Sequence, residues 1–170
     1  LIAGILEVVG DPQPIGRPFG DVYVSLYVLH DQPRVLAGRV AAMAPVVQTP
    51  PDGPIYLGGY VVEPGPVLRG GIIHVHTWWR RGDTVMPDMR VSVRLYDAGG
   101  MFYTQLDQPP VAPWFGQEHW QPGSPVLSRF TVWIPPEIPA GTVYVRMLLY
   151  DMQGRFEPIP VEIDTIEVAG

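Results

Sequence analysis

The sequence predicts an all-β fold. Twenty-one prolines and 19 glycines are spread over 170 residues, and both residue types interrupt helices and mark turns between strands. No segment keeps an apolar period of 3.6 residues, whereas several alternate apolar with polar residues, as strands with one buried face do. Short alternating strands with frequent turns predict a two-sheet antiparallel β-sandwich, immunoglobulin- or fibronectin-like, with about nine or ten strands.

The clearest strands lie within residues 70–100. Side chains alternate between the two faces of a strand. One face of the first strand is expected to belong to the core and carries Ile73, Val75, Thr77 and Trp79. The opposite, outward face carries His74, His76 and Trp78. The second strand alternates in the same way over residues 90–96 and ends at the turn sequence Asp97-Ala98-Gly99-Gly100.

The first third of the chain is less regular. Residues 1–9 are expected to form a strand, or else the remnant that follows a removed segment, and the proline-rich residues 11–14 are expected to end that strand. The β-branched and aromatic content of residues 22–29 predicts another strand. Residues 35–47 have an Ala-rich centre that fits a helical turn, but their Gly and Pro make a helix marginal and favour a strand.

Residues 48–54, Gln-Thr-Pro-Pro-Asp-Gly-Pro, predict a loop and mark an internal boundary. We expect residues 1–54 to be N-terminal strands or an extension that packs on the sandwich, and residues 55–170 to form the sandwich module. Within the sandwich module, residues 107–125 are expected to form a long irregular segment. Strands are expected at residues 55–63, 71–79, 90–96, 101–106, 126–134, 142–150 and 163–168.

Two of these strands end in the same way. Tyr96-Asp97 and Tyr150-Asp151 each precede a turn that contains Gly. Aspartate accepts backbone hydrogen bonds in turns and glycine adopts positive φ angles. Similar turn chemistry therefore explains the likeness, and we do not infer a repeat protein.

Composition excludes several classes of function. The formal net charge is −6 and the pI is near 5.0, which argues against nucleic-acid binding because phosphates require a concentrated basic surface. The chain contains neither cysteine nor lysine, so disulfides, thiolate metal sites and Schiff-base lysines are excluded. The serines lack a nucleophile-elbow context, and the carboxylates lie in predicted turns and loops. We therefore expect no enzymatic activity and no cofactor.

His74 and His76 are weak metal-ligand candidates. Two imidazoles at positions i and i+2 of a strand can face one metal ion. A stable site needs three or four ligands, however, and a third is not identifiable nearby in the sequence, although His30, His119 or a carboxylate could approach in space. The alternative is a polar face that is exposed or covered by another segment.

Aromatic side chains form the second set of candidates. Exposed aromatic rings stack on sugars or fill protein-interface pockets. The loop of residues 111–120 has the composition of a ligand-binding loop, but the general tendency of long loops to bury their own side chains favours a loop that folds over the open end of the sandwich. The candidate binding residues are Trp78, Trp114, Trp120, Trp133 and Tyr144, with Tyr96 beside them.

Short motifs follow one another in order over about residues 55–168. They are Ile55-Tyr56-Leu57-Gly58-Gly59-Tyr60, Thr77-Trp78-Trp79-Arg80, Leu95-Tyr96-Asp97, Gln105-Leu106-Asp107-Gln108-Pro109-Pro110, Trp120-Gln121-Pro122-Gly123, Ile134-Pro135-Pro136-Glu137-Ile138-Pro139-Ala140-Gly141, Leu149-Tyr150-Asp151 and Thr165-Ile166-Glu167-Val168. In these motifs the chain resembles the extracytoplasmic β-sandwich tail module of bacterial membrane glycosyltransferases of the dolichyl-phosphate-mannose transferase type. The resemblance implies an appended module and not the transferase itself, because the transferase chemistry sits in the membrane-embedded part.

These observations predict a non-catalytic accessory, structural or assembly subunit that docks on other protein chains. The resemblance implies a periplasmic or cell-surface location, in a membrane-associated complex or in a self-assembly. The sequence has no apolar run of the length that spans a bilayer and no signal-peptide pattern, while a mean hydropathy of +0.11 favours an apolar surface covered by a partner. The alternative is a carbohydrate-binding accessory module that uses the aromatic loop.

Overall fold

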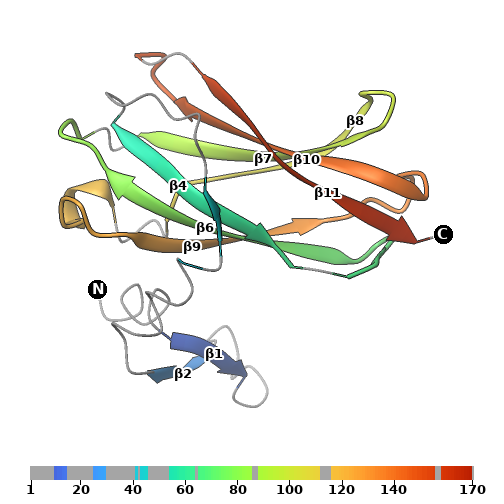
Figure 1. Ribbon diagram of the computed structural model, residues 1–170, viewed down its shortest axis with the longest axis horizontal. Coiled ribbons are helices and arrows are strands. Elements are labelled where there is room, and N and C mark those ends of the chain that lie inside the picture. Colours follow the sequence, from blue (N-terminus) through green and yellow to red (C-terminus); the bar gives the residue numbers. More distant parts are fainter. Residues whose placement is uncertain are drawn as a thin grey trace, which may run out of the picture.

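The computed structural model is all-β and consists mainly of two packed layers of strands (Figure 1). It describes residues 10–14, 25–29, 41, 43–45, 54–63, 65–85, 88–111, 116–155 and 158–169, and for residues 10–14, 25–29, 44–45 and 159 the backbone alone. Within these residues, no helix has the length and apolar character needed to cross a membrane.

One layer is a four-stranded sheet with the order β3-β4-β6-β9. It contains β3 (Ala44–Pro45), β4 (Ile55–Val62), β6 (Ile72–Arg81) and β9 (Val126–Trp133). Every neighbouring pair in this sheet is antiparallel. The short strand β3 pairs with β4, so part of the N-terminal third of the chain joins the sandwich.

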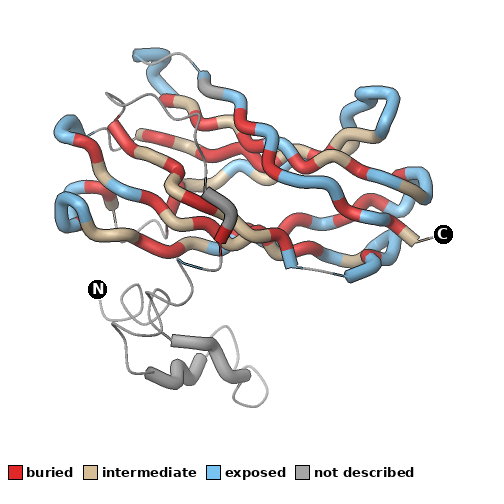
Figure 2. The backbone as a smooth tube through the Cα atoms, viewed as in Figure 1, coloured by how far each residue is buried: buried red, intermediate tan, exposed pale blue. Residues whose placement is uncertain are grey.

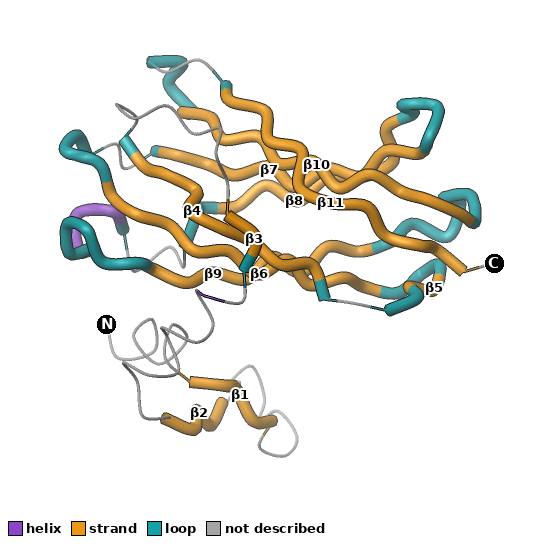
Figure 3. The backbone as a smooth tube through the Cα atoms, in the orientation of Figure 1, coloured by secondary structure: helices purple, strands orange, loops and turns teal. Residues whose placement is uncertain are grey.

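The other layer is a five-stranded sheet with the order β5-β11-β10-β7-β8. It contains β5 (Val67–Leu68), β7 (Met89–Asp97), β8 (Phe102–Gln108), β10 (Gly141–Asp151) and β11 (Ile159–Ala169). All of its pairs are antiparallel except β5 with β11, which run parallel. A short 3₁₀ helix, η1 (Gln117–His119), interrupts the segment between β8 and β9. Figure 3 shows strands making up nearly all of both layers.

Every strand expected between residues 55 and 168 is present, with ends that differ by a few residues. The two-residue strand β5 was not expected, because two residues carry no alternation. The expected strand at residues 22–29 is found at β2 (Ser25–Leu29). Of residues 35–47 the structure describes Ala41, which is helical, and residues 43–45, so the expected strand is shown only over the two residues of β3. The predicted strand at residues 1–9 and most of the predicted loop at residues 48–54 lie outside the described residues.

Residues 11–14 were expected to end a strand, and this prediction is wrong. They belong to β1 (Gly10–Pro14), which pairs with β2 in a separate two-stranded sheet. In a two-stranded sheet, each strand has one edge without a hydrogen-bonded neighbour. A proline whose missing N–H faces that edge removes no hydrogen bond between the strands. Proline therefore interrupts a central strand but is compatible with an edge strand.

The core lies between the two sheets, and Figure 2 shows buried and less buried residues alternating along the strands. Trp79, Ile73 and Val75 are buried as predicted, and Trp79 is fully covered. The polar side chain of Thr77 is also fully buried, because its Oγ1 accepts a hydrogen bond of 2.8 Å from Trp79 Nε1. The alternation of β6 therefore predicts its inward face correctly, including the one polar residue on it.

The turns after β7 and β10 have the same hydrogen bonds. Asp97 and Asp151 each accept a backbone bond of 3.0 Å at the main-chain oxygen, from Gly100 and Gly154 respectively. Each carboxylate also accepts from the backbone N–H four residues on, at 2.9 Å for Asp97 and 2.8 Å for Asp151. Gly100 and Gly154 have φ angles of +83° and +69°. The predicted turn chemistry is confirmed at both positions.

Candidate functional site

The outward face of the four-stranded sheet collects histidine, tryptophan and arginine side chains. We call it the histidine–tryptophan face, and define it by Ile72, His74, His76, Trp78 and Arg80 of β6 and Arg129, Thr131 and Trp133 of β9. These residues alternate with buried ones along both strands. The register brings them together, since Ile72 lies opposite Trp133, His74 opposite Thr131, and His76 opposite Arg129.

The two histidines on this face already have polar partners. His74 Nδ1 lies 3.0 Å from Thr131 Oγ1, and His76 Nε2 lies 2.9 Å from Glu63 Oε1. The hydrogen bond with His76 lowers the pKa of Glu63. The two imidazole rings are tilted by 57° with centroids 6.4 Å apart. Among the described residues, no group of three or more His, Cys, Asp or Glu side chains is arranged to hold a metal ion.

Trp78 is held in place from two directions. A Cβ atom at Gly58 would lie only 2.0–2.3 Å from the far ring atoms of the indole, so the ring occupies the space that any other residue at position 58 would need. The guanidinium of Arg80 lies 4.9 Å from the ring centroid, within cation–π range. Trp78 is therefore half-buried, and its ring is held in one position on this face.

Apolar side chains dominate one corner of the same face. Ile72 and Trp133 are register partners and are 53% and 51% exposed. Leu68 is 65% exposed. Its backbone is joined to this corner by a turn, in which Gly71 N–H donates to Leu68 O and Gly71 O accepts from Ile134 N–H. Ile72 and Trp133 therefore form one corner of this face, which we call the apolar corner, and the exposed Leu68 belongs to β5 of the other sheet.

The outward face of the five-stranded sheet has a different composition. We call it the tyrosine–arginine face, and define it by Arg90, Arg94 and Tyr96 of β7, Phe102, Gln105 and Asp107 of β8, Tyr144, Arg146 and Tyr150 of β10, and Glu162 of β11. The register places Tyr144 opposite Tyr96, and Tyr96 opposite Phe102. It also places Arg146 opposite Arg94, and Arg94 opposite Gln105.

Contacts fix several of these side chains. Tyr96 and Phe102 make an edge-to-face pair with centroids 5.7 Å apart, and the guanidinium of Arg146 lies 5.0 Å from the Tyr96 centroid. Arg94 Nε donates to Ser92 Oγ at 2.9 Å. Asp107 accepts bonds from Gln105 at 2.6 Å and from the Tyr150 hydroxyl at 3.2 Å. Burial, together with Asp107, raises the pKa of Tyr150.

The structure separates the predicted aromatic candidates. Trp78 and Trp133 lie on the histidine–tryptophan face, whereas Tyr144 and Tyr96 lie on the opposite face of the molecule, so they cannot form one site. Trp114 lies outside the described residues. Trp120 is 3% exposed and belongs to the hydrophobic core. Its assignment to a binding surface is corrected here: the chain after η1 turns the indole inward, where burial of a large apolar ring is favourable.

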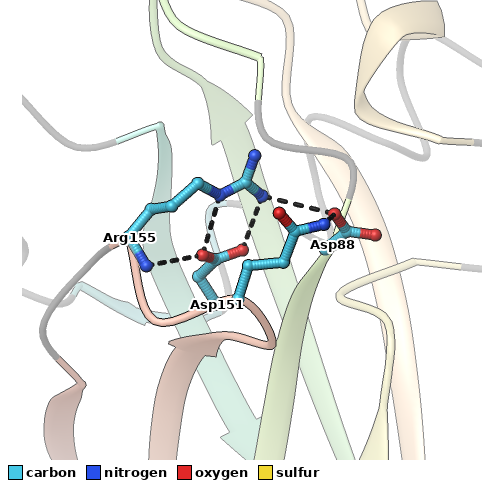
Figure 4. Close-up of polar contacts among 4 residues, drawn as sticks. Asp88, Asp151 and Arg155 are labelled. Atoms are coloured by element: carbon cyan, nitrogen blue, oxygen red, sulfur yellow. Dashed lines mark hydrogen bonds and ion pairs between the residues drawn. The ribbon is translucent and has the colours of Figure 1, made fainter.

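Asp88, Asp151 and Arg155 form a polar network at one end of the sandwich (Figure 4). Arg155 donates to Asp151 through its backbone N–H at 2.8 Å and through its side chain at 2.9 and 2.8 Å. It also reaches Asp88 at 3.3 Å, and Gln153 donates to Asp88 at 2.7 Å. The side-chain bonds from Arg155 hold the pKa of Asp151 at about 2, below its ordinary 3.8. These carboxylates are fully engaged in linking the β10–β11 turn to the start of β7.

The network also revises the sequence interpretation of two carboxylates. Asp88 lies in a turn and its side chain is 40% exposed, as expected, but it also receives bonds from Arg155 and Gln153. Asp107 was expected in a loop, but it is part of β8 and binds Tyr150 across the sheet. Partners more than 40 residues away along the chain leave no local pattern in the sequence, so neither contact could have been predicted from it.

No family model matches the sequence, and no curated protein sequence matches it. The C-terminal domain of Wzt is similar in fold, with a TM-score of 0.46 and 9% identity over 69% of this chain and 75% of that one. A Niemann-Pick type C2 protein from the Japanese carpenter ant has a TM-score of 0.45 and 9% identity, over 73% of this chain and 99% of that one.

A third similar structure is the CARDB domain of a Pyrococcus furiosus protein in complex with di-metal ions. Its TM-score is 0.34 and its identity 14%, over 66% of this chain and 90% of that one. Likenesses of this strength assign neither a family nor an activity to the chain.

Proposed function

We propose that the protein is a non-catalytic β-sandwich module that docks on another protein chain through the apolar corner of the histidine–tryptophan face. From the strand pattern and the sequence resemblance, we further propose that this module is immunoglobulin- or fibronectin-like and works outside the cytoplasmic membrane as an accessory or assembly subunit. The fold supports the more general statement that the chain is an all-β sandwich with two chemically distinct outward faces.

The single observation that carries the proposal is the exposure of Ile72 and Trp133. Each is more than half exposed, and they are direct register partners on neighbouring strands. An exposed Trp beside an exposed Ile is the kind of anchor that fills a pocket on a partner protein, where large rings contribute most of the binding energy. His74, which follows Ile72 on this face, is already held by Thr131, so docking would order few neighbouring side chains and lose little entropy.

A sugar ligand is less favoured at this corner. Sugar sites combine a ring with several hydrogen-bonding side chains, whereas the register partner of Trp133 at the apolar corner is the apolar residue Ile72. Apolar neighbours complement an apolar patch on a protein and leave sugar hydroxyl groups without partners.

The test uses the full chain with a photo-crosslinking amino acid at position 133, and at position 152 as a matched control. Met152 is 62% exposed but lies in the β10–β11 turn, away from the apolar corner. Crosslinking in the source cells, combined with sedimentation velocity of the pure protein, should give a discrete adduct or a dimer from position 133. Ile72→Asp should remove that product.

An adduct of equal yield from positions 133 and 152 would indicate random collision and would overturn the proposal. A monomer at all concentrations, with no adduct from position 133, would overturn it as well. A product from position 133 that persists in Ile72→Asp would place the interface elsewhere.

A further inference from the structure

The tyrosine–arginine face is built of rows that run across its strands. Phe102 of β8, Tyr96 of β7 and Tyr144 of β10 are successive register partners, so their rings form one row. Neighbouring strands are about 4.8 Å apart, and the row therefore continues across three strands of the sheet. Phe102 is 49% exposed, and Tyr96 and Tyr144 are partly exposed.

A row of polar side chains lies beside the aromatic row. Gln105, Arg94, Arg146 and Glu162 are successive partners on β8, β7, β10 and β11. Arg94 and Arg146 lie directly opposite each other, a pairing of like charges that disfavours the sheet. Arg146 reaches Glu162 only at 4.0 Å, and within the described residues no carboxylate lies within ion-pair distance of Arg94. These guanidinium groups retain unused N–H donors.

An acceptor, Asp107, lies beyond the polar row. Asp107 lies next to Gln105 on β8 and accepts from Gln105 and from the Tyr150 hydroxyl. Because a carboxylate oxygen has more than one lone pair, Asp107 can accept further bonds at its exposed side. The hydroxyl of Tyr144 makes no hydrogen bond to any described residue. The polar row beside the aromatic rings, together with Asp107 beyond it, therefore offers both donors and acceptors.

From this arrangement we propose that the tyrosine–arginine face binds an oligosaccharide, with its apolar sugar faces on Tyr144 and Phe102 and its hydroxyl groups on Arg94, Arg146 and Asp107. The mixture of side chains selects the class of ligand. A polyanion would meet Asp107 and Glu162, and an apolar surface would bury the charge of Arg94 without a carboxylate partner, at a large desolvation cost. A chain of hydroxyl groups, which both donate and accept, satisfies both kinds of side chain at once.

This site is independent of the proposed docking site, because the two lie on opposite outward faces of the sandwich (Figure 1). It also differs from the loop of residues 111–120, which the sequence favoured for sugar binding. The register of β7, β8 and β10 carries the inference, and no single segment of the sequence contains the site.

The test is affinity gel electrophoresis of the full chain in gels that contain mixed-linkage β-glucan, galactomannan, dextran or alginate, with poly-glutamate as a non-sugar polyanion. At least one neutral polysaccharide should retard the protein. Tyr144→Ala should weaken that retardation by about tenfold or more, since ring stacking and its buried area are lost together. Phe102→Ala and Arg94→Gln should each weaken it less, and Val85→Ala, at an exposed residue between β6 and β7 that belongs to neither proposed site, should leave it unchanged.

Three results would overturn the inference. The first is the absence of retardation in all four polysaccharide gels. The second is retardation by alginate and poly-glutamate only, which would identify the ligand as an acidic polymer, a polypeptide segment included. The third is retardation that Tyr144→Ala leaves intact. Circular dichroism and an unchanged unfolding midpoint of each variant establish that a loss of binding is not a loss of fold, and crosslinking from position 133 tests the docking proposal separately.

Discussion

Trp78 and Gly58 are complementary across β6 and β4: the indole ring fills the space where a side chain at position 58 would stand, with ring atoms 2.0–2.3 Å from an ideal Cβ. The register shift between Leu57 and Gly59 falls at this point and leaves residue 58 out of the regular pairing. A glycine packed under an aromatic ring on the neighbouring strand recovers the contact area that the missing side chain would have given.

Gly58→Ala should therefore displace the Trp78 ring. The φ angle at position 58 is not positive, so alanine is unstrained and its cost comes from the clash alone. We expect a loss of stability of roughly 1–3 kcal/mol, the usual range for overpacking. Urea unfolding of the variant, with tryptophan fluorescence to report the exposure of Trp78, measures both effects.

The double variant separates the clash from other causes. In Trp78→Ala the obstacle is gone, and Gly58→Ala should then be neutral or stabilising by about 0.4–1 kcal/mol, because alanine restricts the unfolded chain. A cost for Gly58→Ala that is the same in both backgrounds would show that Trp78 is not what excludes a side chain at position 58.

Thr77→Val should expose the energetic role of the buried hydroxyl. Valine fills nearly the same volume and favours strands, so packing is conserved, but the N–H of Trp79 loses its acceptor in a fully buried position. A buried unsatisfied donor costs about 1–3 kcal/mol. Chemical denaturation should show that loss for Thr77→Val and under about 0.5 kcal/mol for Thr131→Val on the exposed face. Equal effects at the two positions would contradict the assignment.

Asp151 makes stability depend on pH in the acidic range. Its pKa is about 2 in the folded protein and 3.8 ordinarily, because of the bonds from Arg155. A lowered folded-state pKa contributes stability that is complete above the unfolded value and is lost as the pH falls through the folded value. Asp151→Asn should therefore unfold at a lower temperature than the native protein at pH 7, and the gap should narrow between about pH 4 and pH 2.

The control for this pH dependence is Asp83→Asn. Asp83 is exposed in the loop between β6 and β7, so its variant should keep the native unfolding midpoint at every pH. Arg155→Gln should reproduce the Asp151→Asn profile. A gap for Asp151→Asn that stays constant from pH 7 to pH 2 would mean that the carboxylate charge is not the stabilising element.

Alternation along single strands was enough to predict most of the sandwich. It placed Trp79, Ile73 and Val75 in the core and His74 and His76 on the opposite face. Odd- and even-numbered residues of one strand point to opposite faces of the sheet, so the sequence alone separates them. It could not show that β6 and β7 belong to different sheets. Which strands are neighbours is decided by contacts between distant segments, and no local pattern encodes it.

The candidate sites were less predictable for the same reason. Tyr96 and Tyr144 could be singled out as aromatic strand residues, but only the register of β7 with β10 shows that they lie opposite each other and beside Arg94 and Arg146. A shift of register by one residue would have sent one ring to the core. The bulge between Leu95 and Tyr96, which brings Phe102 opposite Tyr96, has no sequence signature that could have been recognised.

A side chain at either of the two turn glycines should lower the stability of the protein. Gly100 and Gly154 have φ angles of +83° and +69°, a region that costs other L-residues about 1–2 kcal/mol. Gly100→Ala and Gly154→Ala should each destabilise the protein by about that amount in thermal or urea unfolding. Asparagine, which enters this region more readily, should cost less at both positions. If alanine and asparagine were equally costly, the backbone angle would not be the cause.

Trp120 and Trp133 offer the sharpest contrast between a core and a surface role. Trp120 is 3% exposed and Trp133 is 51% exposed, so Trp120→Ala should cost about 3–5 kcal/mol through the cavity it leaves, and Trp133→Ala under about 0.5 kcal/mol. Urea unfolding measures the two losses, and sedimentation or crosslinking measures docking. Since docking requires the exposed ring only, Trp133→Ala should impair association at native stability. Large destabilisation by Trp133→Ala would instead make it a structural residue, and the apolar corner would lose its anchor.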